Sequence, residues 1–414
     1  MKAIKSETGS KVKKFLGVFG HKSLEQIDNN TSTTRLNTRI LLVDHELRTF
    51  LMHRIKLAKA LQRVGFDVHV ALPFESGLKY LQEEGFSVHD YYLKRQSTQP
   101  SDEFRCFSSL FKIYKQLKPS LIHHFGLKPA LYGGSAARSA GVPAVVNTLT
   151  GLGHLFRANN TKAIILRKLV SIGLTFSFSH KNSKVIVQNW DDLNSLLMNG
   201  VEVSNKASLI KGSGVDISAF TPQPEPGGKP VIMMAARLIW EKGVGEFVKV
   251  AQILRTKGIE AEFVLAGEPD YNHPSAIPLL KLEEWKTKGY VKWIGWCYNM
   301  PQLMKNCHIF CLPSYYGEGV PSVLLEAAAT GRPIITTDSV GCREVVRHGH
   351  NGLLVPVQNT KFLAEAIIQL IENPSLRILM GERSRALTAK EFSLNEVINK
   401  SKDIYTSLLN IPNY

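Results

Sequence analysis

Two kinds of segment are missing from this 414-residue chain, and each absence excludes a class of protein. No apolar run approaches the roughly 18–20 residues that a membrane-spanning helix needs, and the N-terminal FLGVFG is too short for the core of a signal peptide. The five cysteines form no C-x-x-C pair, so buried, reduced thiols are favoured over a metal site or a disulfide framework. We therefore expect a cytoplasmic protein.

Acidic residues are scarce in the first half of the chain. Residues 1–215 contain 30 Lys and Arg against 15 Asp and Glu, whereas residues 216–414 contain 21 against 20. The net charge of +16 is therefore carried almost entirely by the first half, which predicts an anionic partner there. Because no nucleic-acid-binding motif is visible, we expect that partner to be the inner face of the cytoplasmic membrane, with the protein bound peripherally.

Two stretches could make this membrane contact. KVKKFLGVFGHK (11–22) is basic, and TKAIILRKLVSIGLTFSFSHK (161–181) mixes lysine and arginine with large apolar residues, as an interfacial helix does. The alternative interpretations are a mobile leader for the first stretch and an ordinary packed helix for the second.

Strand-length apolar runs alternate with helical patterns after a polar, basic leader at residues 1–37, which we expect to be mobile. Strands are predicted near 39–45, 67–73, 87–93, 120–125, 144–150, 184–189 and 207–211, and again near 231–236, 261–266, 291–294, 308–312, 333–337 and 352–355.

This alternation predicts parallel sheets covered by helices. The fold class is therefore α/β, with two doubly wound, Rossmann-like domains facing one cleft. We assign residues 38–220 to an N-terminal domain and residues 231–390 to a C-terminal domain. The Pro-rich stretch 221–230 is interpreted as the linker, and residues 391–414 as a C-terminal helix.

The stretch 315–346 carries the most specific pattern. An apolar strand ends in a glycine-rich turn, and a short helix over residues 323–329 follows. The start of that helix directs N–H groups and a positive dipole end at the turn, where a diphosphate would bind. Glu318 lies in the turn and Glu326 about one helical turn into the helix. Such carboxylates could bind sugar hydroxyls and a ribose, respectively; the alternative is that both are ordinary solvated charges.

A second pair of candidates, Arg237 and Lys242, lies in the loop after the predicted strand 231–236. The carboxyl end of a parallel strand is where open α/β sheets bind ligands. Arginine can hold a phosphate through two N–H groups, and lysine acts as a point charge. The alternative is a pair of solvated loop cations.

Together these motifs resemble family 4 of the retaining GT-B glycosyltransferases. The matching segments are RLIWEKG (237–243), LAGE (265–268), the two glutamates at 318 and 326, TGRPIITTD (330–338) and NGLLVP (351–356). Upstream, TLTGLGHLF (148–156) and VIVQNWDD (185–192) are similar to the bacterial branch that builds capsule, O-antigen and protein-linked glycans. The resemblance covers residues 38–410 and implies the GT-B fold. In that fold the N-terminal domain binds the acceptor, the C-terminal domain binds the nucleotide-sugar, and the last helix crosses back to the N-terminal domain.

The resemblance also implies a role for each matching residue. Arg237 and Lys242 would hold the donor diphosphate, Glu318 would face the donor sugar, and these three are the catalytic candidates. Glu326 would bind the nucleotide ribose. The other candidates for donor binding are Gly319, Val320, Pro321, Ser322 and Gly267.

One position departs from the family pattern. Many members carry a histidine beside the donor sugar at the end of the fifth strand, whereas Thr150 stands there in this chain. Candidates for the sugar or acceptor pocket are His53, Thr150, Gly151, Gly153 and His154.

The function that the resemblance implies is retaining transfer of a sugar from a nucleoside diphosphate sugar, by family habit UDP-linked, to a polyprenyl-diphosphate-linked glycan. The chain contains no Asp-x-Asp, on which metal-dependent transferases usually hold their ion, so we expect no metal and no cofactor. Two other hypotheses stay open. One is a different enzyme on this fold, either a nucleotide-sugar epimerase, with a donor-only product, or a transferase for a soluble acceptor, with lipid-independent transfer. The other is a non-catalytic partner that binds donor without turnover.

Overall fold

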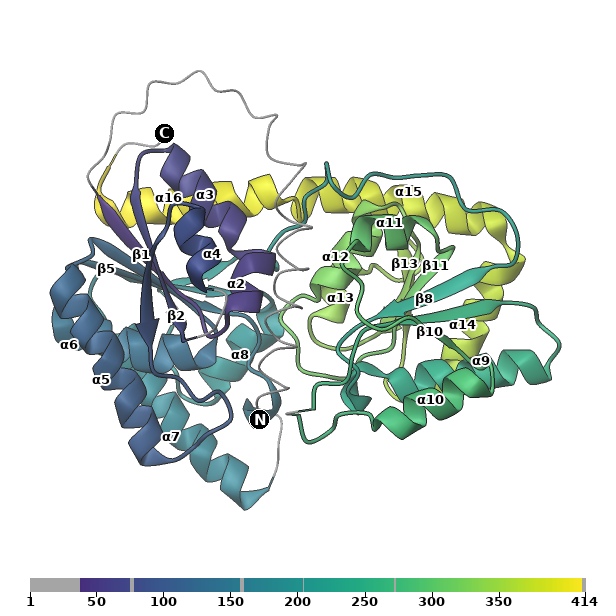
Figure 1. Cartoon of the computed structure of the whole chain (residues 1–414), viewed down its shortest axis with the longest axis horizontal. Helices are drawn as coiled ribbons and strands as arrows, with labels where there is room; N and C mark the ends of the chain where they lie inside the picture. Colours follow the sequence, from purple (N-terminus) through teal and green to yellow (C-terminus); the bar gives the residue numbers. More distant parts are fainter. Residues whose placement is uncertain (1–37, 75–77, 157–159, 204, 272, 412–414) are drawn as a thin grey trace. The chain divides into compact units, whose positions relative to one another are not determined.

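The computed structural model describes residues 38–411 except 75–77, 157–159, 204 and 272 (Figure 1). The described part divides into two compact units. Unit 1 contains the residues up to Ser213 and those from Val397 onward, and unit 2 runs from Gly214 to Glu396. The predicted leader, residues 1–37, lies outside the described residues. None of the described helices is both long and apolar enough to span a bilayer.

Unit 1 is built on a parallel sheet whose described strands follow the order β3-β2-β1-β4-β5-β6-β7. Its strands are β1 (Arg39–Val43), β2 (Asp67–Pro73), β3 (Ser87–Tyr91), β4 (Leu121–Phe125), β5 (Ala144–Leu149), β6 (Ser183–Val187) and β7 (Ala207–Leu209). Its helices are α2 (Leu47–His53), α3 (Ile55–Arg63), α4 (Leu78–Glu83), α5 (Pro100–Leu117), η1 (Pro129–Gly133), α6 (Gly134–Ala140), η2 (His154–Phe156), α7 (Thr161–Phe178), α8 (Trp190–Met198) and, from the chain end, α16 (Leu394–Leu409).

Strand β1 shows why helices cover both faces of this sheet. Ile40 and Leu42 belong to a core with α2, α3 and α16, whereas Leu41 and Val43 belong to a core with α5 and α6. Successive strand side chains point to opposite faces, so a strand that is apolar throughout needs cover on both sides. Figure 1 shows α16 beside α3 and α4, and α5 beside α6 on the other side.

The chain end is fixed to this sheet by a buried histidine. The Tyr405 hydroxyl of α16 is hydrogen-bonded to Nδ1 of His123, and Nε2 of His123 lies 2.6 Å from Oγ1 of Thr148. Burial, and then the nearby Arg54, holds the pKa of His123 well below its ordinary value. A neutral imidazole therefore joins β4, β5 and α16 inside unit 1.

Unit 2 contains a second parallel sheet, with described strands in the order β10-β9-β8-β11-β12-β13. Its strands are β8 (Val231–Ala235), β9 (Glu262–Ala266), β10 (Lys292–Trp293), β11 (Ile309–Leu312), β12 (Ile334–Thr337) and β13 (Gly352–Val355). Its helices are η3 (Trp240–Lys242), α9 (Val244–Thr256), α10 (Leu279–Thr287), α11 (Met300–Lys305), α12 (Ser322–Ala329), α13 (Cys342–Val345), α14 (Thr360–Glu372) and α15 (Pro374–Glu391). Helix α9 contacts α14, and α12 contacts α15. Numbered within this unit, the strands follow the order 3-2-1-4-5-6, which is the order of a doubly wound sheet.

The predicted linker at 221–230 is not where the chain passes between the units; it lies inside unit 2. The carboxylate of Glu225 accepts two hydrogen bonds of 2.9 Å from the buried guanidinium of Arg377. The carbonyl of Pro224 accepts a bond of 3.3 Å from the buried Arg332. Prolines and glycines indicate irregular backbone, but these arginines pack that backbone onto the unit. The chain instead passes between the units at 213–214 and 396–397.

Candidate active site

The candidate residues of unit 2 follow two neighbouring strands. Arg237 and Lys242 come after β8, and Glu318 lies between β11 and α12. Strands β8 and β11 are paired in parallel, so their carboxyl ends open onto the same edge of the sheet. Strand β8 also pairs with β9, so this edge is the point where the strand order reverses and where such sheets bind ligands.

Close backbone packing fixes the loops at this edge. Gly243 has a φ of 81°, and a Cβ atom there would lie 2.2 Å from the carbonyl oxygen of Pro313. Gly341 has a φ of 80°, and its Cβ would lie 2.0 Å from the carbonyl oxygen of Gly319. Only glycine allows both approaches. The loop after β8, the turn before α12 and the segment after β12 are therefore held against one another.

Lys242 and Glu318 are in direct contact. Nζ of Lys242 lies 2.6 Å from Oε2 of Glu318, and the Ser314 hydroxyl donates a 3.0 Å hydrogen bond to the other carboxylate oxygen. The lysine and glutamate side chains are only 10% and 14% exposed. The alternative of two independently solvated charges is therefore excluded for this pair.

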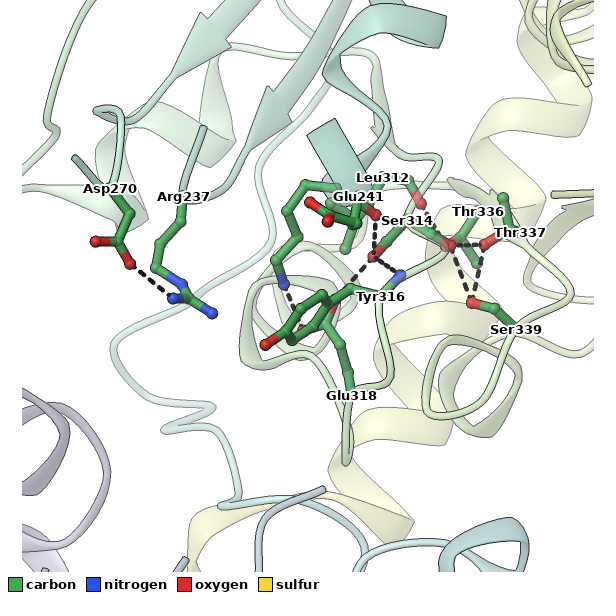
Figure 2. A network of polar contacts seen from close by, with 11 residues as sticks. Arg237, Glu241, Asp270, Leu312, Ser314, Tyr316, Glu318, Thr336, Thr337 and Ser339 are labelled. Carbon is green, nitrogen blue, oxygen red and sulfur yellow. Dashed lines mark hydrogen bonds and ion pairs between the residues drawn. The ribbon is translucent and has the colours of Figure 1, made fainter. Parts of the chain in front are cut away.

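Arg237 has partners that the sequence did not indicate. Its guanidinium donates a 3.0 Å hydrogen bond to Asp270, and its Cζ lies 5.9 Å from the centre of the Tyr316 ring. Nζ of Lys242 lies 5.5 Å from the same ring, so both cations lie close to it. Burial alone would lower the pKa of Arg237, but Tyr316, Asp270 and Glu318 raise it above its ordinary value. Figure 2 shows Asp270 beside Arg237 and the Tyr316 ring directed toward it.

Hydroxyl groups donate hydrogen bonds to the backbone at and before Ser314 (Figure 2). Thr337 and Ser339 both donate to the Ser314 carbonyl, the latter at 3.0 Å, and Thr336 donates to the Leu312 carbonyl at 2.6 Å. The threonines end β12, the neighbour of β11. Sequence analysis noted their segment, TGRPIITTD, but gave these side chains no role.

Glu326 lies apart from this network. It is half-buried in the second turn of α12, and within the described residues its carboxylate has no hydrogen-bond or ion-pair partner. Burial raises its pKa to about 8. A desolvated carboxylate without a partner is costly unless a ligand supplies hydrogen-bond donors. An ordinary solvated helix residue does not fit this environment.

The remaining donor-site candidates line the same edge. Pro321 precedes the first residue of α12, Ser322, and provides no side-chain hydrogen bond to cap the helix. Val320 is buried beside it. Gly267 follows β9 with a φ of 130°, and a Cβ atom there would lie 1.9 Å from the carbonyl oxygen of Ala236. Gly267 thus allows the backbone after β9 to pass directly against the backbone after β8.

The acceptor-pocket candidates are all in unit 1. His53 ends α2, and burial, followed by the charge of Arg54, lowers its pKa to about 4. Thr150 directly follows β5, and no hydrogen bond in the described part of the chain joins it to His53. Gly151 and Gly153 have φ angles of 119° and 66°. His154 begins η2, and its side chain lies outside what the structure describes.

Sequence analysis missed a polar cluster directly after β1. Nδ1 of His45 lies 2.9 Å from the buried carboxylate of Asp44, whose other oxygen lies 4.0 Å from Nε of the buried Arg54. Burial alone would lower the pKa of His45, but Asp44 raises it above its ordinary value. Two polar residues at the end of an apolar strand were the available signal. In the described residues, no group of three or more His, Cys, Asp or Glu could hold a metal ion.

Comparison with known proteins matches both halves of the chain. Residues 39–189 fit the family model described as glycosyl transferase 4-like, and residues 217–387 fit glycosyl transferases group 1. A Campylobacter jejuni protein, N,N'-diacetylbacillosaminyl-diphospho-undecaprenol alpha-1,3-N-acetylgalactosaminyltransferase, is 30% identical over 386 residues, covering 90% of this chain and 99% of the relative. The chain belongs to the group 1 glycosyltransferases.

Two further likenesses are with a second bacterial transferase and with a solved structure. An Escherichia coli UDP-Gal:alpha-D-GlcNAc-diphosphoundecaprenol alpha-1,3-galactosyltransferase is 25% identical, over 74% of this chain and 80% of the relative. The crystal structure of Anabaena HepE in complex with UDP superposes with a TM-score of 0.72 at 18% identity, over 89% of this chain and 100% of that one. These findings confirm the predicted GT-B fold and the predicted family.

Proposed function

We propose that this transferase moves a sugar, with retention of configuration, from a UDP-linked donor to a polyprenyl-diphosphate-linked glycan. The observation that carries the proposal is the likeness to two transferases named for diphospho-undecaprenol acceptors, one of them matched over 99% of its length. The second of these is also named for a UDP-linked donor. The geometry of unit 2 supplies the chemistry that such a donor requires.

The donor diphosphate would bind between the loop after β8 and the start of α12. Arg237 and Lys242 provide positive charge there, and α12 adds the N–H groups and the positive dipole end of its first turn. These groups stabilise charge that grows on the leaving diphosphate, and one such contact is typically worth about 3–4 kcal/mol in the transition state. They provide the charge that a divalent ion supplies in other transferases, so we propose a metal-independent reaction.

The two glutamates would hold different parts of the donor. Glu326 would accept both hydroxyls of the ribose, which are the donors that its carboxylate lacks. Glu318, oriented by Lys242 and Ser314, would accept hydroxyls of the sugar. A retaining glycosidase instead needs two carboxylates about 5 Å apart across the scissile bond, one of them a nucleophile. We therefore assign no nucleophile: the leaving phosphate takes the proton of the attacking hydroxyl on the same face of the sugar.

A lipid-linked acceptor would bring the enzyme to the membrane surface. The excess of Lys and Arg in residues 1–215 suits an anionic leaflet, so we propose peripheral association with its cytoplasmic side.

The experiment that tests this function is nucleotide release from a panel of uridine and guanosine diphosphate sugars, with and without lipid extract. Lipid-stimulated release from one uridine donor, lost in Glu326→Ala, is the expected result. Nucleotide release that does not depend on lipid, together with transfer to a water-soluble glycan, would instead indicate a transferase for a soluble acceptor. A donor-only product would indicate an epimerase. Donor binding without any release would favour the non-catalytic partner.

A further inference from the structure

Helix α7 carries a row of exposed apolar side chains. Ile165, Leu169, Ile172 and Phe176 are 56%, 61%, 69% and 46% exposed. Their spacing of four, three and four residues places them on one face of the helix. The opposite face packs normally, because Leu174 and Phe178 are buried in the core that also contains η1. The exposed row therefore does not contribute to the hydrophobic core of unit 1.

Positive charge borders this row. At about 100° per residue, Lys162 and Lys168 lie about 60° to either side of it, and both are exposed. At the end of the row, the guanidinium carbon of Arg138, from α6, lies 4.7 Å from the centre of the Phe176 ring. Helix α7 contains no aspartate or glutamate. The face is thus apolar along its centre and cationic along both sides.

The end of α8 is joined to the last turns of α7. The Thr175 hydroxyl donates a 3.4 Å hydrogen bond to the carbonyl of Gly200, which ties the end of α8 to the last turns of α7. Met198, two residues before Gly200, is 88% exposed. Helix α7 contacts α6, and in Figure 1 its first turns extend to the lower edge of unit 1.

We propose that α7 docks this transferase onto an anionic lipid surface. The row of Ile165, Leu169, Ile172 and Phe176 enters the boundary between headgroups and acyl chains, and the bordering cations contact lipid phosphates. A second copy of the chain fits this face less well, because two such helices would bring lysines together with no acidic residue on α7 to pair with them. The inference rests on the proposed function in one respect: a lipid-linked acceptor is the reason for the enzyme to bind a membrane.

This attachment differs from simple attraction between a basic protein and an anionic surface. Salt screens the charges of Lys162 and Lys168, but it does not screen burial of the apolar row. Binding of the wild-type chain to vesicles should therefore fall with added salt and level off above zero.

The test is co-sedimentation of the purified full chain with phosphatidylcholine vesicles, with and without phosphatidylglycerol, in the absence of donor and acceptor. Leu169→Ser/Ile172→Ser should lower the partition coefficient at least about tenfold. Leu279→Ser/Leu280→Ser on α10 is the matched control, because its leucines are 47% and 87% exposed on a helix of unit 2, and it should bind like wild type. Lys162→Gln/Lys168→Gln should weaken binding to the anionic vesicles only.

Equal binding by the α7 leucine–isoleucine variant and the α10 control would overturn the proposal. The proposal would also be overturned, in favour of self-association, by two results together. These are a wild-type chain that does not bind vesicles but dimerises, and loss of the dimer in the α7 variant. Every side chain changed is exposed, so each variant should fold like wild type. Comparison of Tm values checks this. Nucleotide release in detergent-solubilised lipid separates the two proposals: vesicle binding without turnover contradicts the proposed function alone, and turnover without vesicle binding contradicts the docking alone.

Discussion

Glu326→Gln should stabilise the folded protein at alkaline pH while it removes nucleotide binding. The carboxylate is half-buried and has no partner among the described residues, and burial raises its pKa to about 8 from an ordinary value near 4.5. Below about pH 4.5 the group is protonated in both the folded and the unfolded chain. As the pH rises from there through about 8, the unfolded chain releases the proton first, so the folded state loses stability over this window.

The size of the effect follows from the two pKa values. The interval from 4.5 to about 8, at about 1.36 kcal/mol per pH unit, gives at most about 5 kcal/mol. The side chain keeps some contact with water, so we discount this to about 2 kcal/mol. A glutamine has no charge to desolvate. We therefore expect Tm to rise by about 4–8 °C at about pH 9 and to stay unchanged at about pH 4.

Thermal unfolding at several pH values measures this, with Glu318→Gln as the matched control. That substitution makes the same chemical change eight residues earlier, but it removes the partner of the mostly buried Lys242 and should lower stability by about 1–3 kcal/mol. If Glu326→Gln is less stable than wild type at about pH 9, or is stabilised equally across the pH range, the reasoning from desolvation is refuted.

Four further predictions can be tested with the same protein. UDP affinity, measured by calorimetry, should rise between about pH 6 and 8 with net proton release, because the ribose hydroxyls bind the ionised form of the α12 carboxylate; a flat profile would contradict this. Arg237→Ala and Lys242→Ala should each lower kcat about 10²–10³-fold, whereas Lys249→Ala, exposed on α9, should not. Turnover should survive EDTA; loss that Mg²⁺ restores would refute metal independence. Arg377→Ala should lower the free energy of unfolding by about 3–5 kcal/mol, because it leaves Glu225 unpaired; an unchanged denaturation midpoint would contradict that.

The fold could be predicted from sequence because its signals are local. Each predicted strand is present, with ends within two residues of the prediction. A strand covered on both faces is a continuous apolar run, and it is recognisable without knowing its neighbours. The short helix after the glycine-rich turn begins at Ser322, one residue before the predicted start. The family motifs also led directly to Arg237, Lys242 and both glutamates.

Contacts between distant segments could not be predicted in this way. Asp270 meets Arg237 only because β8 and β9 are neighbours, and a single aspartate 33 residues away carries no pattern. The linker prediction failed for the same reason. Its prolines describe the local backbone, whereas its place is set by Arg377, 152 residues away from Glu225. The clustering of hydroxyls beneath Ser314 likewise depends on the pairing of β11 with β12.

The two glutamates of one motif lie in opposite environments, and this difference separates their chemistry. Glu318 has an ammonium group at 2.6 Å and a hydroxyl at 3.0 Å, so its carboxylate is oriented before any sugar binds. An attack by one oxygen of Glu318 on a sugar carbon would disturb the contact which that oxygen makes, whereas accepting a further hydroxyl would keep both contacts. In the part of the chain that the structure describes, Glu326 has no such partner, and burial raises its pKa. A ligand that brings two hydroxyls would supply the hydrogen-bond donors that its carboxylate lacks. On the proposed function, Lys242 and Ser314 therefore orient Glu318 toward the sugar, and Glu326 is left for the ribose.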